Sequence, residues 1–121
     1  MDPVRFPNQE ARSLLCAGKV AEFNALREEF NAIWKNNLWR PQLVGANFKG
    51  LNLRGANLAG ADLQVADLSY TNLSGADLEL ANLGSADLRG AVLCFANLSA
   101  ADLHGIKTDT ATFGLPIVTQ L

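Results

Sequence analysis

Residues 46–105 read ANFKG LNLRG ANLAG ADLQV ADLSY TNLSG ADLEL ANLGS ADLRG AVLCF ANLSA ADLHG, which is twelve blocks of five without an insertion. The central residue of each block is Phe48 in the first block and leucine in every later one. Two places earlier stands alanine, except at Leu51 and Thr71, and between the two stands Asn or Asp, except at Val92. So regular a repeat indicates one small structural unit used many times.

A period of five residues fits neither a helix nor a straight strand. Five residues of an α-helix turn a side chain by roughly 140°, so successive leucines would spiral around the axis. A strand has a period of two and would place them on alternate faces. A backbone that turns once in every block keeps all leucines on one side, and Asn, Asp and Gly favour such turns. The repeat therefore predicts a β-solenoid of stacked coils, with leucine and the small alanine inside.

The tandem A-[DN]-L-x-x pattern resembles the pentapeptide-repeat family. This resemblance implies a right-handed quadrilateral β-helix with four blocks per coil, extending over residues 41–115 when the weaker flanking blocks are included. Interior residues would then stack at a spacing of 20 in the sequence, as in the ladder of Leu43, Leu63, Leu83 and Leu103. The larger rings of Phe48 and Phe113 would fill the interior at the two ends.

Residues 1–40 are predicted to form an α-helical cap, because the first coil of a solenoid exposes an apolar interior and unpaired backbone edges. Asn8 is the expected N-cap of a short helix that ends before Gly18. A second helix is indicated by apolar residues at a spacing of three to four, with charged residues on its other side. The apolar residues are Val20, Phe23, Leu26, Phe30 and Ile33, and the charged ones are Glu22, Arg27, Glu28 and Glu29.

The cap also resembles the N-terminal helical segment of many bacterial pentapeptide-repeat proteins. An alternative reading makes its apolar stripe a helix that docks in a partner's groove. Residues 116–121 form a C-terminal tail, which is apolar enough to lie across the last coil and over Phe95. Cap, repeats and tail are expected to form one structural domain.

No catalytic, cofactor-binding or metal-binding residues are predicted. His104 is the only histidine and takes an outward position of its block, and neither Cys16 nor Cys94 has an evident general base. The stacked Asp and Asn side chains are required by the repeat itself, whereas an oxygen-ligated cation needs about six ligands arranged as a cage. Two isolated cysteines make no disulfide framework, so two thiols in a reducing compartment are expected.

Charge and hydropathy exclude several partners. The formal net charge of −2 gives no basic surface for nucleic acid or membrane. No apolar run reaches the roughly 20 residues needed to cross a bilayer, and the N-terminus lacks the order of a secretory signal. A cytoplasmic, bacterial protein is expected, and the family is especially abundant in cyanobacteria.

Two outward surfaces are candidate contacts for another protein. The first is apolar and comprises Val92, Cys94 and Phe95. The second is a strip of mixed charge in which Lys49, Ser69 and Arg89 stand beside Asn47, Asp67 and Asp87, with Tyr70 next to it. Neighbouring opposite charges on this strip are expected to relieve the repulsion between stacked carboxylates. We select Val92, Cys94, Phe95, Lys49, Tyr70 and Arg89 as the candidate interaction residues.

The leading hypothesis for function is a non-catalytic scaffold or protein-interaction module, a monomer or weak dimer, since a solenoid binds along its outer faces. The alternative is a DNA mimic that binds DNA gyrase, like the quinolone-resistance members of the family. Against this stand the short rod and a charge of only −3 in residues 46–105, from six acidic and three basic side chains. An enzyme is the third and weakest hypothesis.

Overall fold

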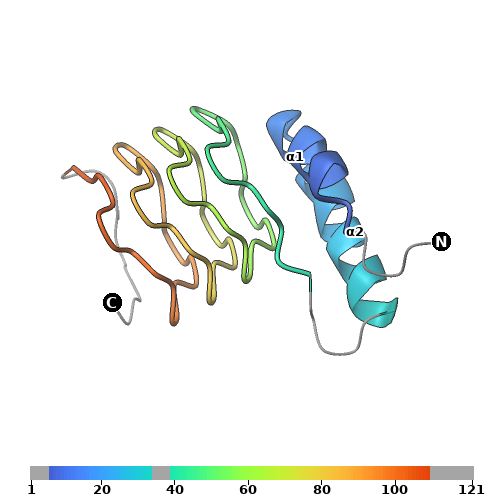
Figure 1. Ribbon diagram of the computed structural model, residues 1–121. Coiled ribbons are helices and arrows are strands. Elements are labelled where there is room, and N and C mark those ends of the chain that lie inside the picture. Colours follow the sequence, from blue (N-terminus) through green and yellow to red (C-terminus); the bar gives the residue numbers. More distant parts are fainter. Residues whose placement is uncertain (1–5, 34–38, 110–121) are drawn as a thin grey trace.

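The fold is a stack of coils with two helices at one end (Figure 1). The computed structural model describes residues 6–33 and 39–109, and for residues 31–33 only the backbone. The helices are α1 (Asn8–Cys16) and α2 (Val20–Ile33). Successive coils are joined by parallel β-bridges between residues 20 apart, from Gln42 with Asp62 to Asp87 with Lys107. This register places four blocks of five in each coil, as predicted.

The coils are held by isolated bridges rather than by strands. In the described residues, every bridge outside a named strand joins a single residue of one block to a single residue of the next coil, and no longer strand is present. The cause is the turn in each block, which bends the backbone away before a second residue can continue in line. The predicted β-solenoid is thus a ladder of single bridges with a bend after each.

Each bend is stabilised by the Asn or Asp of its block. The side-chain oxygen accepts a hydrogen bond from the backbone N–H two residues later, as Asn47 does from Lys49 at 3.1 Å and Asp77 from Glu79 at 3.0 Å. The last residue of the block then takes a positive φ, which is 73° at Gly90. Val92 has no side-chain oxygen, so the block AVLCF cannot make this bond.

The interior of the stack is filled by the repeat's leucines and alanines. Leu53, Leu73 and Leu93 are at most 2% exposed, and Phe48 is completely buried in the first coil. Thr71 replaces an alanine at an interior position and donates a hydrogen bond from Oγ1 to the Phe48 carbonyl at 2.8 Å. Leu103, in the last described coil, is only half-buried. Phe113 and the tail expected to cover Phe95 lie outside the described residues.

Both predicted helices form, but two of their residues differ from expectation. Asn8 is not an N-cap: it is the first residue of α1, and its Oδ1 accepts hydrogen bonds from Trp39 Nε1 at 2.8 Å and from the Gln42 N–H at 3.1 Å. Arg27 does not lie on a solvated side of α2, since its side chain is completely buried. In both cases the side chain forms hydrogen bonds with polar groups in or next to the first coil.

Arg27 is held by two backbone carbonyls and an aromatic ring. Its Nη1 donates to the Trp39 carbonyl at 2.7 Å and its Nη2 to the Ala59 carbonyl at 2.6 Å, and the guanidinium carbon lies 5.2 Å from the centre of the Trp39 ring. Burial lowers the pKa of Arg27 to about 10, against the raising influence of the Asp77 charge. The group stays protonated at neutral pH, and α2 carries a buried cation against the first coil.

Candidate interaction surface

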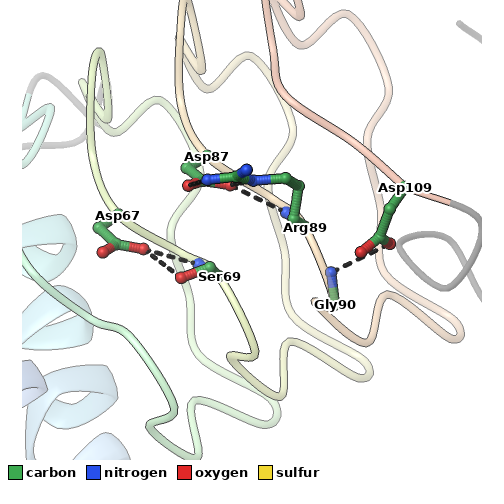
Figure 2. A network of polar contacts seen from close by, with 6 residues as sticks. All are labelled: Asp67, Ser69, Asp87, Arg89, Gly90 and Asp109. Atoms are coloured by element: carbon green, nitrogen blue, oxygen red, sulfur yellow. Dashed lines mark hydrogen bonds and ion pairs between the residues drawn. The ribbon is translucent and has the colours of Figure 1, made fainter.

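A polar hollow of about 470 Å³ opens on the face where Asn47, Asp67, Asp87 and Lys107 are joined by β-bridges. It forms because the outward column Lys49, Ser69, Arg89 has a small serine between two long side chains. Figure 2 shows the polar pairs of this face on successive coils. The hollow is lined by Lys49, Asp67, Ser69, Tyr70, Asp87, Arg89 and Asp109.

Asp87 and Arg89 form the ion pair of the hollow. Arg89 Nη2 lies 2.8 Å from Asp87 Oδ2, and its Nε donates to Oδ1 at 3.0 Å (Figure 2). The hydrogen bond from the Arg89 side chain lowers the pKa of Asp87 to about 2. Here the expected relief of stacked carboxylates by a neighbouring base is confirmed.

Asp67 is held by hydrogen bonds from Ser69 and has no basic partner among the described residues. Its Oδ1 accepts from the Ser69 N–H at 3.0 Å and from Ser69 Oγ at 2.5 Å (Figure 2). Within the described parts of the chain, Asp67 Oδ2 has no hydrogen-bond partner and Lys49 forms no ion pair. Lys49 therefore does not neutralise a stacked carboxylate as expected, and the hollow keeps one cation and one carboxylate oxygen for an external group.

Tyr70 forms the aromatic wall of the hollow, in a conformation that is costly for a tyrosine. Its φ is 57°, in the left-handed region, and the residue is 63% exposed. The ring lies across Gly90: a Cβ at that glycine would come within 2.5 Å of Tyr70 Cδ1. The Gly90 N–H donates to Asp109 Oδ1 at 3.2 Å (Figure 2). Gly90 thus leaves room for the ring on one side and anchors Asp109 on the other.

The six residues selected from the sequence fall into two groups. Lys49, Tyr70 and Arg89 meet in the polar hollow. The other three, Val92, Cys94 and Phe95, belong to block 91–95, which follows the block of Arg89 and lies on the next face of the coil. Val92 is 40% and Phe95 is 70% exposed, and Cys94 is half-buried. Phe95, like Tyr70, has a positive φ, of 61°. Val92, Cys94 and Phe95 do not line the polar hollow.

One lining residue was not predicted. Asp109 belongs to the segment IKTDT, which departs from the repeat, so periodicity gave no signal for it. The remaining carboxylates were indicated by the spacing of 20.

The side chains of the hollow can bind charged and aromatic groups. His104 lies on another face and is exposed. Over residues 6–33 and 39–109, no three His, Cys, Asp or Glu side chains are grouped so that they could hold a metal ion, and neither cysteine forms a disulfide. In the same residues neither helix has the length and apolar character to cross a membrane.

Comparison with known families gives one match, to pentapeptide repeats, in 8 copies over residues 42–79 and 76–107. These ranges cover more than half of the chain. Comparison with curated protein sequences gives no match.

Solved structures with the same repeats superpose on the chain. A pentapeptide repeat protein from the thylakoid lumen of Arabidopsis thaliana has a TM-score of 0.59 and 35% identity, over 63% of this chain and 53% of that one. HetL, a pentapeptide repeat protein involved in heterocyst differentiation regulation in the cyanobacterium Nostoc sp. strain PCC 7120, has a TM-score of 0.49 and 37% identity. That match covers 55% of this chain and 33% of HetL. The chain thus spans about half or less of each relative.

Proposed function

Because the chain belongs to the pentapeptide-repeat family, we propose that it is a non-catalytic protein-interaction module that binds its partner at the polar hollow. In this proposal the repeats form a right-handed, four-sided rod. The rod fixes the spacing of the outward side chains, and the hollow supplies the chemistry of recognition.

We further propose that α1 and α2 form the N-terminal cap of the rod. Their side chains bond backbone groups of the first coil that, in later coils, pair with the preceding coil. Asn24 supports this most directly: its Oδ1 accepts from the Asn57 N–H at 2.8 Å and its Nδ2 donates to the Gly55 carbonyl at 3.0 Å. In the next coil the equivalent Asp77 N–H bonds the Ala56 carbonyl at 3.0 Å. The Oδ1 of Asn24 thus takes the place of a missing backbone carbonyl, while its bond to the Gly55 carbonyl is an additional contact.

The exposed Tyr70 ring on the wall of the polar hollow is the observation that carries the interaction hypothesis. A left-handed φ costs an L-residue roughly 1–2 kcal/mol, and glycine would avoid that cost. Tyr70 bears it while leaving most of its ring in water, but Leu80 and Phe95 do the same at the last position of their blocks. Tyr70 differs from them because its ring lies across Gly90 and lines the hollow beside Lys49 and Asp67. An exposed aromatic ring beside open charges favours a role in binding.

The charges around Tyr70 define the partner surface that fits. Lys49 and Asp67 Oδ2 are open to an external carboxylate and an external cation, while the Arg89–Asp87 pair is already matched. A partner with one acidic and one basic side chain beside an apolar or cationic group for the Tyr70 ring would be complementary.

Capture from an extract of the source organism tests this proposal, with a photo-crosslinking residue placed at position 108, an exposed residue next to Asp109 at the rim of the hollow, so that Lys49 is kept. We expect Tyr70→Gly to abolish the crosslinked product without lowering thermal stability. Leu80→Gly is the matched control, because Leu80 is also an exposed corner residue, 54% exposed with a φ of 61°, and lies two blocks further along the coil. It should leave the product unchanged. Equal crosslinking by both variants would contradict the proposal.

A protein partner, a monomeric or weakly dimeric state and a cytoplasmic location stay predictions.

A further inference from the structure

A second hollow, of about 590 Å³, lies between the first coil and the start of α2. It is separate from the polar hollow and does not depend on the function proposed there. It is lined by Gly18, Lys19, Val20, Ala21, Glu22, Asn52, Arg54 and Gly55.

The register of the stack identifies the backbone groups that face this hollow. In the next coil, the Asn72 N–H donates to the Leu51 carbonyl at 2.9 Å, and the carbonyls of Asn72 and Ser74 accept from Leu53 and Gly55 at 2.8 and 2.9 Å. The equivalent groups in the first coil are the Asn52 N–H, the Asn52 carbonyl and the Arg54 carbonyl. They point away from the stack, toward α1 and α2.

The helices bond the first coil on its other faces but leave these three groups without a partner among the described residues. On the face of Gln42, Asn8 accepts from the Gln42 N–H and Arg12 Nη2 donates to the Val44 carbonyl at 3.2 Å. On the face of Asn57, Asn24 and Arg27 bond the Asn57 N–H and the Ala59 carbonyl. No backbone or side-chain hydrogen bond reaches the corresponding groups of Asn52 and Arg54.

We propose that this edge binds an extended, acidic peptide segment of a partner protein, which adds one parallel block to the first coil. Its backbone would offer one carbonyl to the Asn52 N–H, then an N–H two residues later to the Asn52 carbonyl and another, two residues further, to the Arg54 carbonyl. This is the pattern by which Leu51, Leu53 and Gly55 bond the next coil. Addition of a strand to an open edge is an established mode of peptide recognition.

The charges of the hollow select an acidic peptide. Lys19 and Arg54 are both exposed and form no ion pair in the described residues, whereas Glu22 is the one acidic side chain in the lining. In the register of the stack, the residue beside Arg54 points outward, so glutamate at that place would meet the guanidinium. The inward positions must be small, because Val20 and Ala21 line the hollow.

The probe is the blocked peptide Ac-Ala-Asp-Ala-Glu-Gly-NH2, titrated into the full chain and followed by backbone amide NMR. We expect saturable shifts confined to residues 18–22 and 52–55, and slower hydrogen exchange of the Asn52 N–H. N-methylation of the third and fifth residues removes both donors. It should weaken binding by about tenfold or more, which is the loss of affinity expected when two ordinary hydrogen bonds are removed.

Reversing a charge on the protein and on the peptide together distinguishes specific recognition from a variant that has merely lost its fold. Arg54→Glu should weaken binding of the glutamate probe and favour the same peptide with lysine in place of glutamate; Lys19→Glu provides the same test at a second position. Binding unaffected by N-methylation or by charge exchange would overturn the proposal, as would the absence of a saturable shift at millimolar probe. A wild-type dimer dissociated by Arg54→Glu would assign the edge to a second copy instead, and would equally overturn it.

Discussion

The stack of coils and the pair of helices satisfy the same kind of backbone group by opposite means. Inside the stack, the Asn72 N–H bonds the Leu51 carbonyl, and the same bond recurs in each later block. At the N-terminal end, individual side chains bond such groups instead: Asn24 bonds the Asn57 N–H, and Arg27 bonds the Ala59 carbonyl. The difference teaches that repetition makes the coils robust and predictable, whereas the end of the stack depends on a few specific residues.

The largest effect is expected from breaking the stack itself. Leu78 is completely buried, and Leu78→Lys would place an unpaired ammonium among leucines and alanines. This costs several kcal/mol, comparable with the roughly 5–15 kcal/mol that stabilise a whole domain. We expect no folded protein by circular dichroism. Glu79→Lys, on the exposed neighbouring residue, is the control and should fold; a folded Leu78→Lys variant would refute the interior assigned to the repeat.

The next effect concerns the helices. Arg27→Ala leaves the carbonyls of Trp39 and Ala59 without their donors and should lower the free energy of unfolding by about 2–4 kcal/mol. Arg12→Ala removes one bond, to the Val44 carbonyl, from an exposed side chain and should cost less than about 1 kcal/mol. Urea denaturation measures both. Equal losses would mean that burial of the guanidinium adds nothing.

Arg27 also marks where prediction from sequence ends. The leucine ladders, the spacing of 20 and the turn role of Asn and Asp follow from a period that every block repeats. Arg27 stands directly before Glu28 and Glu29, and the helical pattern places it with the charged residues. What buries it is the Ala59 carbonyl, 32 residues away, together with Trp39. No residue close to Arg27 in the sequence indicates that it has these partners.

In the polar hollow, too, some residues could be predicted from the repeat and others could not. Tyr70 and Arg89 could be selected because the column of the repeat brings their coils together. The orientation of the Tyr70 ring over Gly90, and the entry of Asp109 from outside the repeat, depend on contacts that no period encodes.

A smaller effect of opposite sign is expected where the repeat itself is imperfect. Val92→Asn restores the side-chain oxygen that the other blocks use to bond the N–H two residues later, here that of Cys94. Because Val92 is partly exposed, little burial is lost, and the free energy of unfolding should rise by about 0.5–1.5 kcal/mol. Val92→Ala, which cannot make the bond, should not raise it. Thermal unfolding of the three proteins distinguishes the bond from simple removal of valine.

The smallest effect is a pH dependence in the polar hollow. Since the folded-state pKa of Asp87 is lowered to about 2 by Arg89, its pairing stabilises the protein above the ordinary carboxyl pKa of about 3.9, and this contribution is lost as the pH falls toward 2. Carbon NMR of the Asp87 carboxyl should give a midpoint near 2. Arg89→Gln should return it toward the ordinary value, while Arg54→Gln should not move it. A wild-type midpoint near 3.9 would show that the ion pair does not persist in solution.

Hydrogen exchange in the first coil tests most directly whether helix side chains replace a missing coil. The amides of Gln42 and Asn57 bond Asn8 and Asn24, whereas the Asn52 amide has no partner in the described residues. We predict that the Gln42 and Asn57 amides exchange slowly and the Asn52 amide fast. Asn24→Ala should release the Asn57 amide while that of Gln42 stays protected. Equal exchange of all three amides in the wild type, or an Asn57 amide unaffected by Asn24→Ala, would contradict this account.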